Sequence, residues 1–121
     1  MRVAAIGSRG LTVDDMEIYL PRNISEIVSG GAKGVDTSAK AYAIEKGIKL
    51  TEFLPDYKQY RRSAPLKRNV EIINYADMVI AFWDGASRGT KFVIEKCMEI
   101  KKPLIIYRYD EKNNIFRKQK L

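Results

Sequence analysis

The sequence contains no histidine and only one cysteine, Cys97. Without histidine the chain lacks the commonest general base and the commonest metal ligand, and it cannot form a Ser–His or Cys–His nucleophile. A single cysteine permits neither an internal disulfide nor a cysteine-based zinc site. Cys97 falls in an apolar helical pattern with Val93 and Ile100, which predicts a buried structural thiol. We therefore predict no metal site, and any enzymatic chemistry would depend on carboxylates, arginines and hydroxyl groups.

Long apolar runs are also missing. No segment approaches the ~18 residues that span a bilayer. The opening stretch, MRVAAIGSRG, is too short for the core of a signal peptide and leads at once into glycine and arginine. With 121 residues, 45% of them hydrophobic and 31% charged, the composition is that of one globular domain. We expect a cytoplasmic protein without membrane contact.

Short apolar runs alternate with helical patterns along the chain. The runs at 3–6, 26–28, 48–53, 78–83 and 104–107 predict buried parallel strands. This alternation predicts an α/β fold, a Rossmann-like three-layer sandwich with a five-stranded parallel sheet in the order 3-2-1-4-5. The domain is expected to span residues 1–108, and residues 109–121 to form a basic C-terminal extension.

Apolar spacing locates the helices between these strands. An alanine-rich helix is expected at about 35–46, with Gly47 as its C-cap and Pro65 in the first turn of the next helix. Three further sets of apolar residues each predict one helix face: Val13, Met16 and Leu20; Leu66, Val70 and Ile73; and Val93, Cys97 and Ile100.

Glycine-rich loops follow the first, second and fourth predicted strands. They read GSRG at 7–10, SGGAKG at 29–34 and DGASRGT at 84–90. In a parallel sheet these loops lie beyond the carboxyl ends of the strands, where ligands bind at the reversal of strand order. Glycines there let backbone N–H groups converge on an anion, which the helix N-terminus behind them also attracts. The loops match neither GxGxxG nor the P-loop, so they predict an anion site without naming its ligand.

Several polar side chains near these loops have both a ligand-binding and a structural interpretation. Asp36 suits a ribose hydroxyl or the first turn of a helix, and Asp84 suits ribose or a metal-bridged phosphate. Ser87 and Thr90 suit phosphate or a helix cap, and Trp83 suits stacking on a base or packing in the core. Asp77 starts its strand and so lies at the opposite end of the sheet.

The net charge of +7 is concentrated in two places. Between residues 58 and 68 there are five basic residues and no acidic one, with Tyr57 and Tyr60 nearby, a composition that suits nucleic acid as well as small phosphates. The nucleic-acid candidates outside the loops are Lys58, Arg61, Arg62 and Lys67. The second basic segment, after Tyr109, is interpreted as a solvated tail.

Four segments in order, GSR, VSGGAKGVDTSAKAYAIEKG, LKRN and ADMVIAFWDGASRGT, resemble the SLOG superfamily, and most of all its YspA-like branch. The resemblance extends to about Tyr107. It implies a Rossmann-like fold that binds or processes a nucleotide-derived ligand, and related folds that pair through helices imply a homodimer. The ligand-binding residues predicted from the loops and this resemblance are Gly7, Ser8, Arg9, Ser29, Gly30, Gly31, Gly34, Asp36, Arg68, Asn69, Asp84, Gly85, Ser87, Gly89 and Thr90.

Two related families imply rival functions. The Lonely Guy phosphoribohydrolases cleave nucleoside monophosphates with an arginine, matched here by Arg68, and a glutamate whose position is Val93 in this chain. The candidate catalytic residues are Arg68, Asp84 and Glu95. Glu95 stands two residues after the position of that glutamate. The DNA-processing protein A family binds single-stranded DNA and shares the SGGAKGVD-like stretch and the RN pair. The leading hypothesis is binding or sensing of a phosphate-bearing nucleotide-like ligand, with nucleotide hydrolysis and single-stranded nucleic-acid binding as alternatives.

Overall fold

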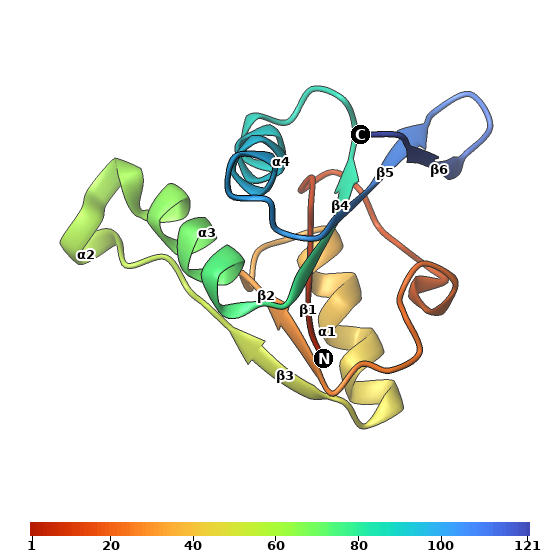
Figure 1. The fold of residues 1–121 in the computed structure, drawn as a ribbon, viewed down its shortest axis with the longest axis horizontal. Helices are drawn as coiled ribbons and strands as arrows, with labels where there is room; N and C mark the ends of the chain where they lie inside the picture. Colours follow the sequence, from red (N-terminus) through yellow and green to blue (C-terminus); the bar gives the residue numbers. More distant parts are fainter.

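The computed structural model describes residues 1–121 as a six-stranded sheet between two layers of helices (Figure 1). The elements in chain order are β1 (Arg2–Gly7), the 3₁₀ turn η1 (Met16–Ile18), β2 (Glu26–Ser29), α1 (Val35–Lys46), β3 (Lys49–Glu52), α2 (Tyr57–Tyr60), the 3₁₀ turn η2 (Arg61–Ser63), α3 (Ala64–Tyr75), β4 (Met78–Trp83), α4 (Arg88–Ile100), β5 (Leu104–Asp110) and β6 (Ile115–Gln119). Helices α3 and α4 cover one face of the sheet, and α1 with η1 covers the other.

The sheet runs in the order β3-β2-β1-β4-β5-β6, which confirms the predicted α/β fold and the order of its five parallel strands. The sixth strand was not predicted. Residues 115–119 pair antiparallel with β5, so part of the expected basic extension closes the sheet as an edge strand. Asn114, with φ of 54°, turns the chain, and Asp110 accepts a hydrogen bond from Arg117 Nε at 3.0 Å across the hairpin.

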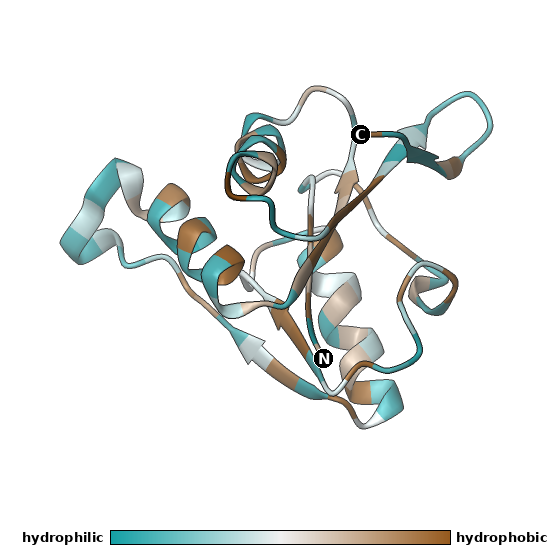
Figure 2. Ribbon diagram, viewed as in Figure 1, coloured by the Kyte–Doolittle hydropathy of each residue, from teal (hydrophilic) through white to brown (hydrophobic).

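The central strands are apolar on both sides because each face of the sheet is covered. Val3 and Ala5 of β1 pack in the α1 layer, whereas Ala4 and Ile6 pack beneath α3 and α4. Figure 2 shows the same distribution, with hydrophobic strands at the centre and a mainly hydrophilic α2 at the periphery. A continuous apolar run is what a doubly covered parallel strand requires.

The predicted helix through Val13, Met16 and Leu20 is wrong. All three side chains are buried, but the backbone forms only the 3₁₀ turn Met16–Ile18 within an irregular connection. Tyr19 in this connection packs edge-on against Phe82 and other aromatic rings of the sheet. Tertiary packing thus buries the apolar residues without the helix that their spacing indicated.

The helix at Val35–Lys46 is confirmed, with Gly47 in the left-handed region at its C-terminus and Pro65 in the first turn of α3. The predicted inner faces of α3 and α4 are wrong in part, because Leu66 is 43% exposed and Ile100 is 41% exposed. In the N-terminal half of α3, the buried positions are Ala64 and two polar residues, Arg68 and Asn69. None of the helices is long and apolar enough to cross a membrane.

Candidate functional site

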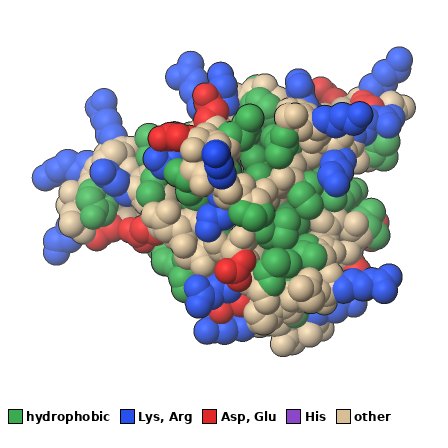
Figure 3. Space-filling view, viewed as in Figure 1, with side chains coloured by type: hydrophobic (Ala, Val, Ile, Leu, Met, Phe, Trp, Pro, Cys, Tyr) green, Lys and Arg blue, Asp and Glu red, His purple; other side chains and the backbone are tan.

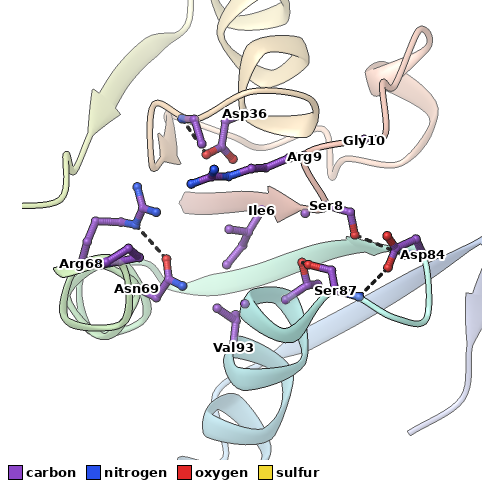
Figure 4. A pocket seen from close by; sticks show the side chains of 15 residues that line it. Ile6, Ser8, Arg9, Gly10, Asp36, Arg68, Asn69, Asp84, Ser87 and Val93 are labelled. Carbon is purple, nitrogen blue, oxygen red and sulfur yellow. Dashed lines mark hydrogen bonds between the residues drawn. The ribbon is translucent and has the colours of Figure 1, made fainter. Parts of the chain in front are cut away.

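A pocket of about 440 Å³ lies at the carboxyl edge of the sheet (Figure 4). The turns after β1, β2 and β4 form its wall together with the N-terminal halves of α3 and α4 and the start of α1. Its lining is mostly polar, with an apolar floor that includes Ile6 and Val93. The volume falls in the range of about 300–1,000 Å³ typical of small-molecule sites.

Ten of the residues predicted to bind ligand line this pocket: Gly7, Ser8, Arg9, Asp36, Arg68, Asn69, Asp84, Ser87, Gly89 and Thr90. Five others do not line it: Ser29, Gly30, Gly31, Gly34 and Gly85. The lining residues that sequence reasoning missed are Ile6, Gly10, Ala32, Pro65 and Val93. Gly10 and Ala32 belong to the glycine-rich loops, so the loop motif itself was the signal that pointed to them.

The glycines that do not line the pocket hold its loops together. A Cβ on Gly30 would lie 2.5 Å from Arg68 Nη1, so this glycine admits the guanidinium. A Cβ on Gly34 would lie 2.4 Å from the carbonyl oxygen of Arg9, and Gly34 also has a φ of 73°. These glycines therefore permit close contact between protein segments, whereas the loop motifs predict close contact with an anion.

Asp84 organises the turn that leads into α4. Its Oδ1 accepts hydrogen bonds from the backbone amides of Ala86 and Ser87 at 2.8 and 2.7 Å. Partial burial would raise the pKa of Asp84, but these two amides and the Ser8 hydroxyl outweigh it, so the pKa lies below the usual value. The backbone N–H of Asp84 donates to Ser8 Oγ at 3.3 Å, which joins the first loop to the fourth.

The N-terminus of α4 presents unused donors to the pocket. Ser87 precedes the helix, but its hydroxyl makes no capping hydrogen bond and lies 3.4 Å from that of Thr90. The first amides of α4, at Arg88, Gly89 and Thr90, have no acceptor within the chain. Unpaired amides at a helix N-terminus attract anions.

Trp83 is packed against the protein and does not line the pocket. Its Nε1 donates to the carbonyl oxygen of Ser87 at 3.1 Å, and the guanidinium carbon of Arg108 lies 5.6 Å from its ring centroid. Arg108 also occupies the space beside Gly85, where a Cβ would lie 2.4 Å from Nη2. The packing interpretation of Trp83 therefore fits the structure, and Gly85 makes room for Arg108.

Arg68 is a buried cation in the wall of the pocket, with 8% of its surface exposed. Its Nη1 donates to the carbonyl oxygen of Gly30 at 2.6 Å, and its Nε donates to Asn69 Oδ1 at 2.8 Å. Burial lowers the pKa of Arg68, and the negative charge of Asp36 opposes that shift. Arg68 thus connects α3 to the second loop while remaining in the pocket wall.

Asp36 is the buried acid of the site, with 5% of its surface exposed. Its Oδ2 accepts a hydrogen bond from the Ala32 amide at 3.0 Å, whereas its Oδ1 is buried without any partner. Burial raises the pKa of Asp36 above the usual value, and the backbone amides of Ala32 and Gly30 and the charge of Arg68 oppose the rise without cancelling it.

This raised pKa predicts a measurable pH dependence. Between the ordinary pKa of 3.8 and the raised one, the folded chain holds a proton at Asp36 that the unfolded chain has lost. Stability from this group therefore falls as pH rises through that window. Asp36→Asn removes the titration, so the unfolding free energy of D36N minus that of the wild type should grow by up to ~1.4 kcal/mol per pH unit there.

Urea unfolding of both proteins from about pH 4 to about pH 7 measures this difference. The acids whose pKa is lowered, Glu26, Asp84 and Asp110, contribute the opposite slope, but they are present in both proteins and cancel in the difference. A difference that stays constant with pH would show that Asp36 is not desolvated as described.

The remaining candidates lie outside the pocket. Glu95 is exposed on α4, and the nucleic-acid candidates Lys58, Arg61, Arg62 and Lys67 are exposed on α2, η2 and the start of α3. Figure 3 shows Lys and Arg side chains projecting at the α2 end and again near the hairpin. Cys97 is fully buried, and burial raises the pKa of its thiol to about 11, as befits a structural cysteine.

Comparison with known proteins gives one match. The YspA, cpYpsA-related SLOG family (YAcAr) matches residues 1–60, which include the loops after β1 and β2. Searches of curated proteins and of solved structures gave no significant match. The match covers the stretch that contributes Ser8, Arg9 and Asp36 to the pocket, and it agrees with the Rossmann-like order of the sheet. The chain belongs to the SLOG superfamily, in its YspA-related branch.

Proposed function

We propose that this protein binds a phosphate-bearing, nucleotide-derived ligand in the pocket at the carboxyl edge of its sheet. The observation that carries the proposal is the set of unpaired donors at the N-terminus of α4, facing a cavity that also contains Arg9 and Arg68. Membership of the SLOG family supports a nucleotide-related ligand.

The donors supply most of the free energy that micromolar binding needs, about −8 kcal/mol. A partly buried helix N-terminus contributes up to ~2 kcal/mol. Each charged hydrogen bond from Arg9 or Arg68 adds about 1.5–3 kcal/mol, so the three elements together reach about 5–8 kcal/mol. Contacts to the Ser8, Ser87 and Thr90 hydroxyls and to the base would supply the rest.

Binding is favoured over N-glycoside hydrolysis of the Lonely Guy type. Val93, which stands at the position of that family's glutamate, lines the pocket with an apolar side chain. Glu95, the nearest acid along the helix, is exposed outside the pocket. The acids that do line it are Asp36, at the start of α1, and Asp84, in the turn after β4, and Asp84 uses Oδ1 to hold its own turn.

The proposal is tested by thermal unfolding with AMP, ADP-ribose, NAD and cyclic nucleotides. A ligand at ~100 times its Kd should stabilise the fold by about 2.7 kcal/mol. Gly89→Ala should weaken that ligand by ~10-fold or more, because the added methyl group occupies the space in front of the α4 amides. The same substitution should not destabilise the free protein, since a Cβ at Gly89 meets no atom within 4 Å and φ there is not positive.

Ala86→Ser is the matched control for Gly89→Ala. Ala86 is exposed on the same turn but does not line the pocket, so both the affinity and the melting temperature should stay unchanged. Absence of a thermal shift with every compound, or a shift that G89A leaves intact, would argue against binding at this pocket.

A further inference from the structure

Asp36 and Arg68 are opposite buried charges that line the same cavity without forming an ion pair. Asp36 is 5% exposed and Arg68 is 8% exposed, and both line the pocket. Both border Gly30, since a Cβ there would lie 3.1 Å from Asp36 Oδ2 and 2.5 Å from Arg68 Nη1. None of the ion pairs of the chain joins the two residues.

Each of the two side chains keeps one polar atom unused. Asp36 Oδ1 is buried without a hydrogen-bond partner, although the Oδ2 of the same carboxylate is satisfied by Ala32. Arg68 donates through Nη1 and Nε but makes no hydrogen bond through Nη2. A buried acceptor without a donor is costly, so its retention next to an open cavity indicates a group supplied from outside the chain.

The chemistry of that outside group is narrowly defined. A phosphate oxygen accepts from arginine but is repelled by a carboxylate, and an ammonium group does the reverse. A hydroxyl group donates one hydrogen bond and accepts others, so it can donate to Asp36 Oδ1 and accept from Arg68 at once. The pair therefore matches a sugar hydroxyl better than it matches a phosphate or an ammonium group.

Arg9 extends beside Asp36 (Figure 4), whereas the anion-attracting amides of α4 lie on the other side of the pocket. Figure 4 places Ser8, Asp84 and Ser87 together at the end opposite Arg68, with Ile6 and Val93 between the two ends. The free amides at the start of α4 belong to the first of these ends. A ligand that satisfies both ends carries a phosphate and, beyond a short apolar stretch, a hydroxyl group.

We infer that the pocket selects ribose phosphates, with Asp36 accepting a hydrogen bond from a ribose hydroxyl while Arg68 donates to the same oxygen. This inference rests on the proposed function and assigns the sugar end of the site to Asp36. Asp84 then serves to hold the turn before α4. The ligand class is a ribonucleoside 5′-phosphate or ribose 5-phosphate, and deoxyribose analogues are discriminated against.

The test is calorimetric titration of the wild type and D36N with AMP, 2′-deoxy-AMP, 3′-deoxy-AMP and pyrophosphate. For the wild type, removal of the recognised hydroxyl should weaken binding roughly 10-fold to 100-fold. In D36N, AMP should weaken by a similar factor, and AMP and the deoxy analogue should bind equally. Pyrophosphate should bind both proteins alike, because it does not reach Asp36.

The outcomes separate the two proposals. If AMP and both deoxy analogues bind the wild type equally, or if D36N weakens all four compounds by one common factor, the assignment of Asp36 is overturned while phosphate binding stands. If neither pyrophosphate nor any nucleotide binds the wild type, the proposed function fails and the inference fails with it. Comparing ligands on one folded protein keeps the first test independent of how D36N folds.

Discussion

Arg68→Met is expected to lower the free energy of unfolding by about 3 kcal/mol and to weaken binding of nucleotides roughly 10-fold to 100-fold. Methionine has a similar length but no donors, so the carbonyl oxygen of Gly30 and Asn69 Oδ1 each lose a hydrogen bond. A buried group left unsatisfied costs about 1–3 kcal/mol. Asp36 also loses the positive charge that opposes its desolvation, which adds to the loss.

Urea unfolding with an unchanged m-value measures the stability part of this prediction, and titration with the best nucleotide measures the rest. The stability and the nucleotide affinity of Arg68→Lys should lie between those of the wild type and R68M. Lysine keeps the charge but lacks the forked donors that reach Gly30 and Asn69 together. Arg62→Met is the control: Arg62 is exposed outside the pocket, so the change should stay within ~0.5 kcal/mol. If R68M behaves like R62M, the buried network around Arg68 is not as described.

The order of the sheet could be predicted because it depends on local signals. Apolar runs such as 78–83 alternate with helical patterns, and right-handed crossovers then leave few ways to arrange the strands. The edge strand β6 was missed because its exposed charges, among them Arg117 and Lys118, read as a solvated tail. Charged residues are common on edge strands, where they discourage pairing with another chain.

The residue types of the site were visible in the sequence, but their roles depend on what stands opposite each one. A glycine before a helix looks the same whether an anion or another loop approaches it, and only the structure shows Arg68 against Gly30 and Arg9 against Gly34. Likewise, Asp36 and Arg68 lie 32 positions apart, and no spacing rule reveals that they border one cavity without pairing. The apolar spacing predicted that Leu66 is buried. The buried face of α3 instead carries the polar Arg68 and Asn69 where it meets the pocket, and apolar spacing does not reveal such a face.

Gly34→Ala is expected to destabilise the fold by about 3 kcal/mol or more, while Gly47→Ala should cost only about 1 kcal/mol. Both glycines have a positive φ, 73° and 66°, so alanine pays a backbone cost at either position. They differ in what a Cβ would meet: nothing within 4 Å at Gly47, but the carbonyl oxygens of Arg9 and Ser8 at 2.4 and 2.7 Å for Gly34. Those atoms belong to the backbone, so no side-chain rotation relieves the clash, and the first and second loops must separate.

The difference between G34A and G47A therefore combines the contact between the two loops with a larger backbone cost at Gly34, whose ψ of −120° lies outside the left-handed helical region that Gly47 adopts with a ψ of 30°. Urea unfolding of both variants gives that difference, and nucleotide titration reports whether the pocket survives it. G47A should bind like the wild type, because Gly47 lies at the C-terminal end of α1 and does not line the pocket. G34A should lose affinity even where it remains folded, because it separates the loop that carries Arg9 from the start of α1, which carries Asp36. Equal costs for the two variants would mean that these loops do not touch, and the shared pocket would then lose its structural basis.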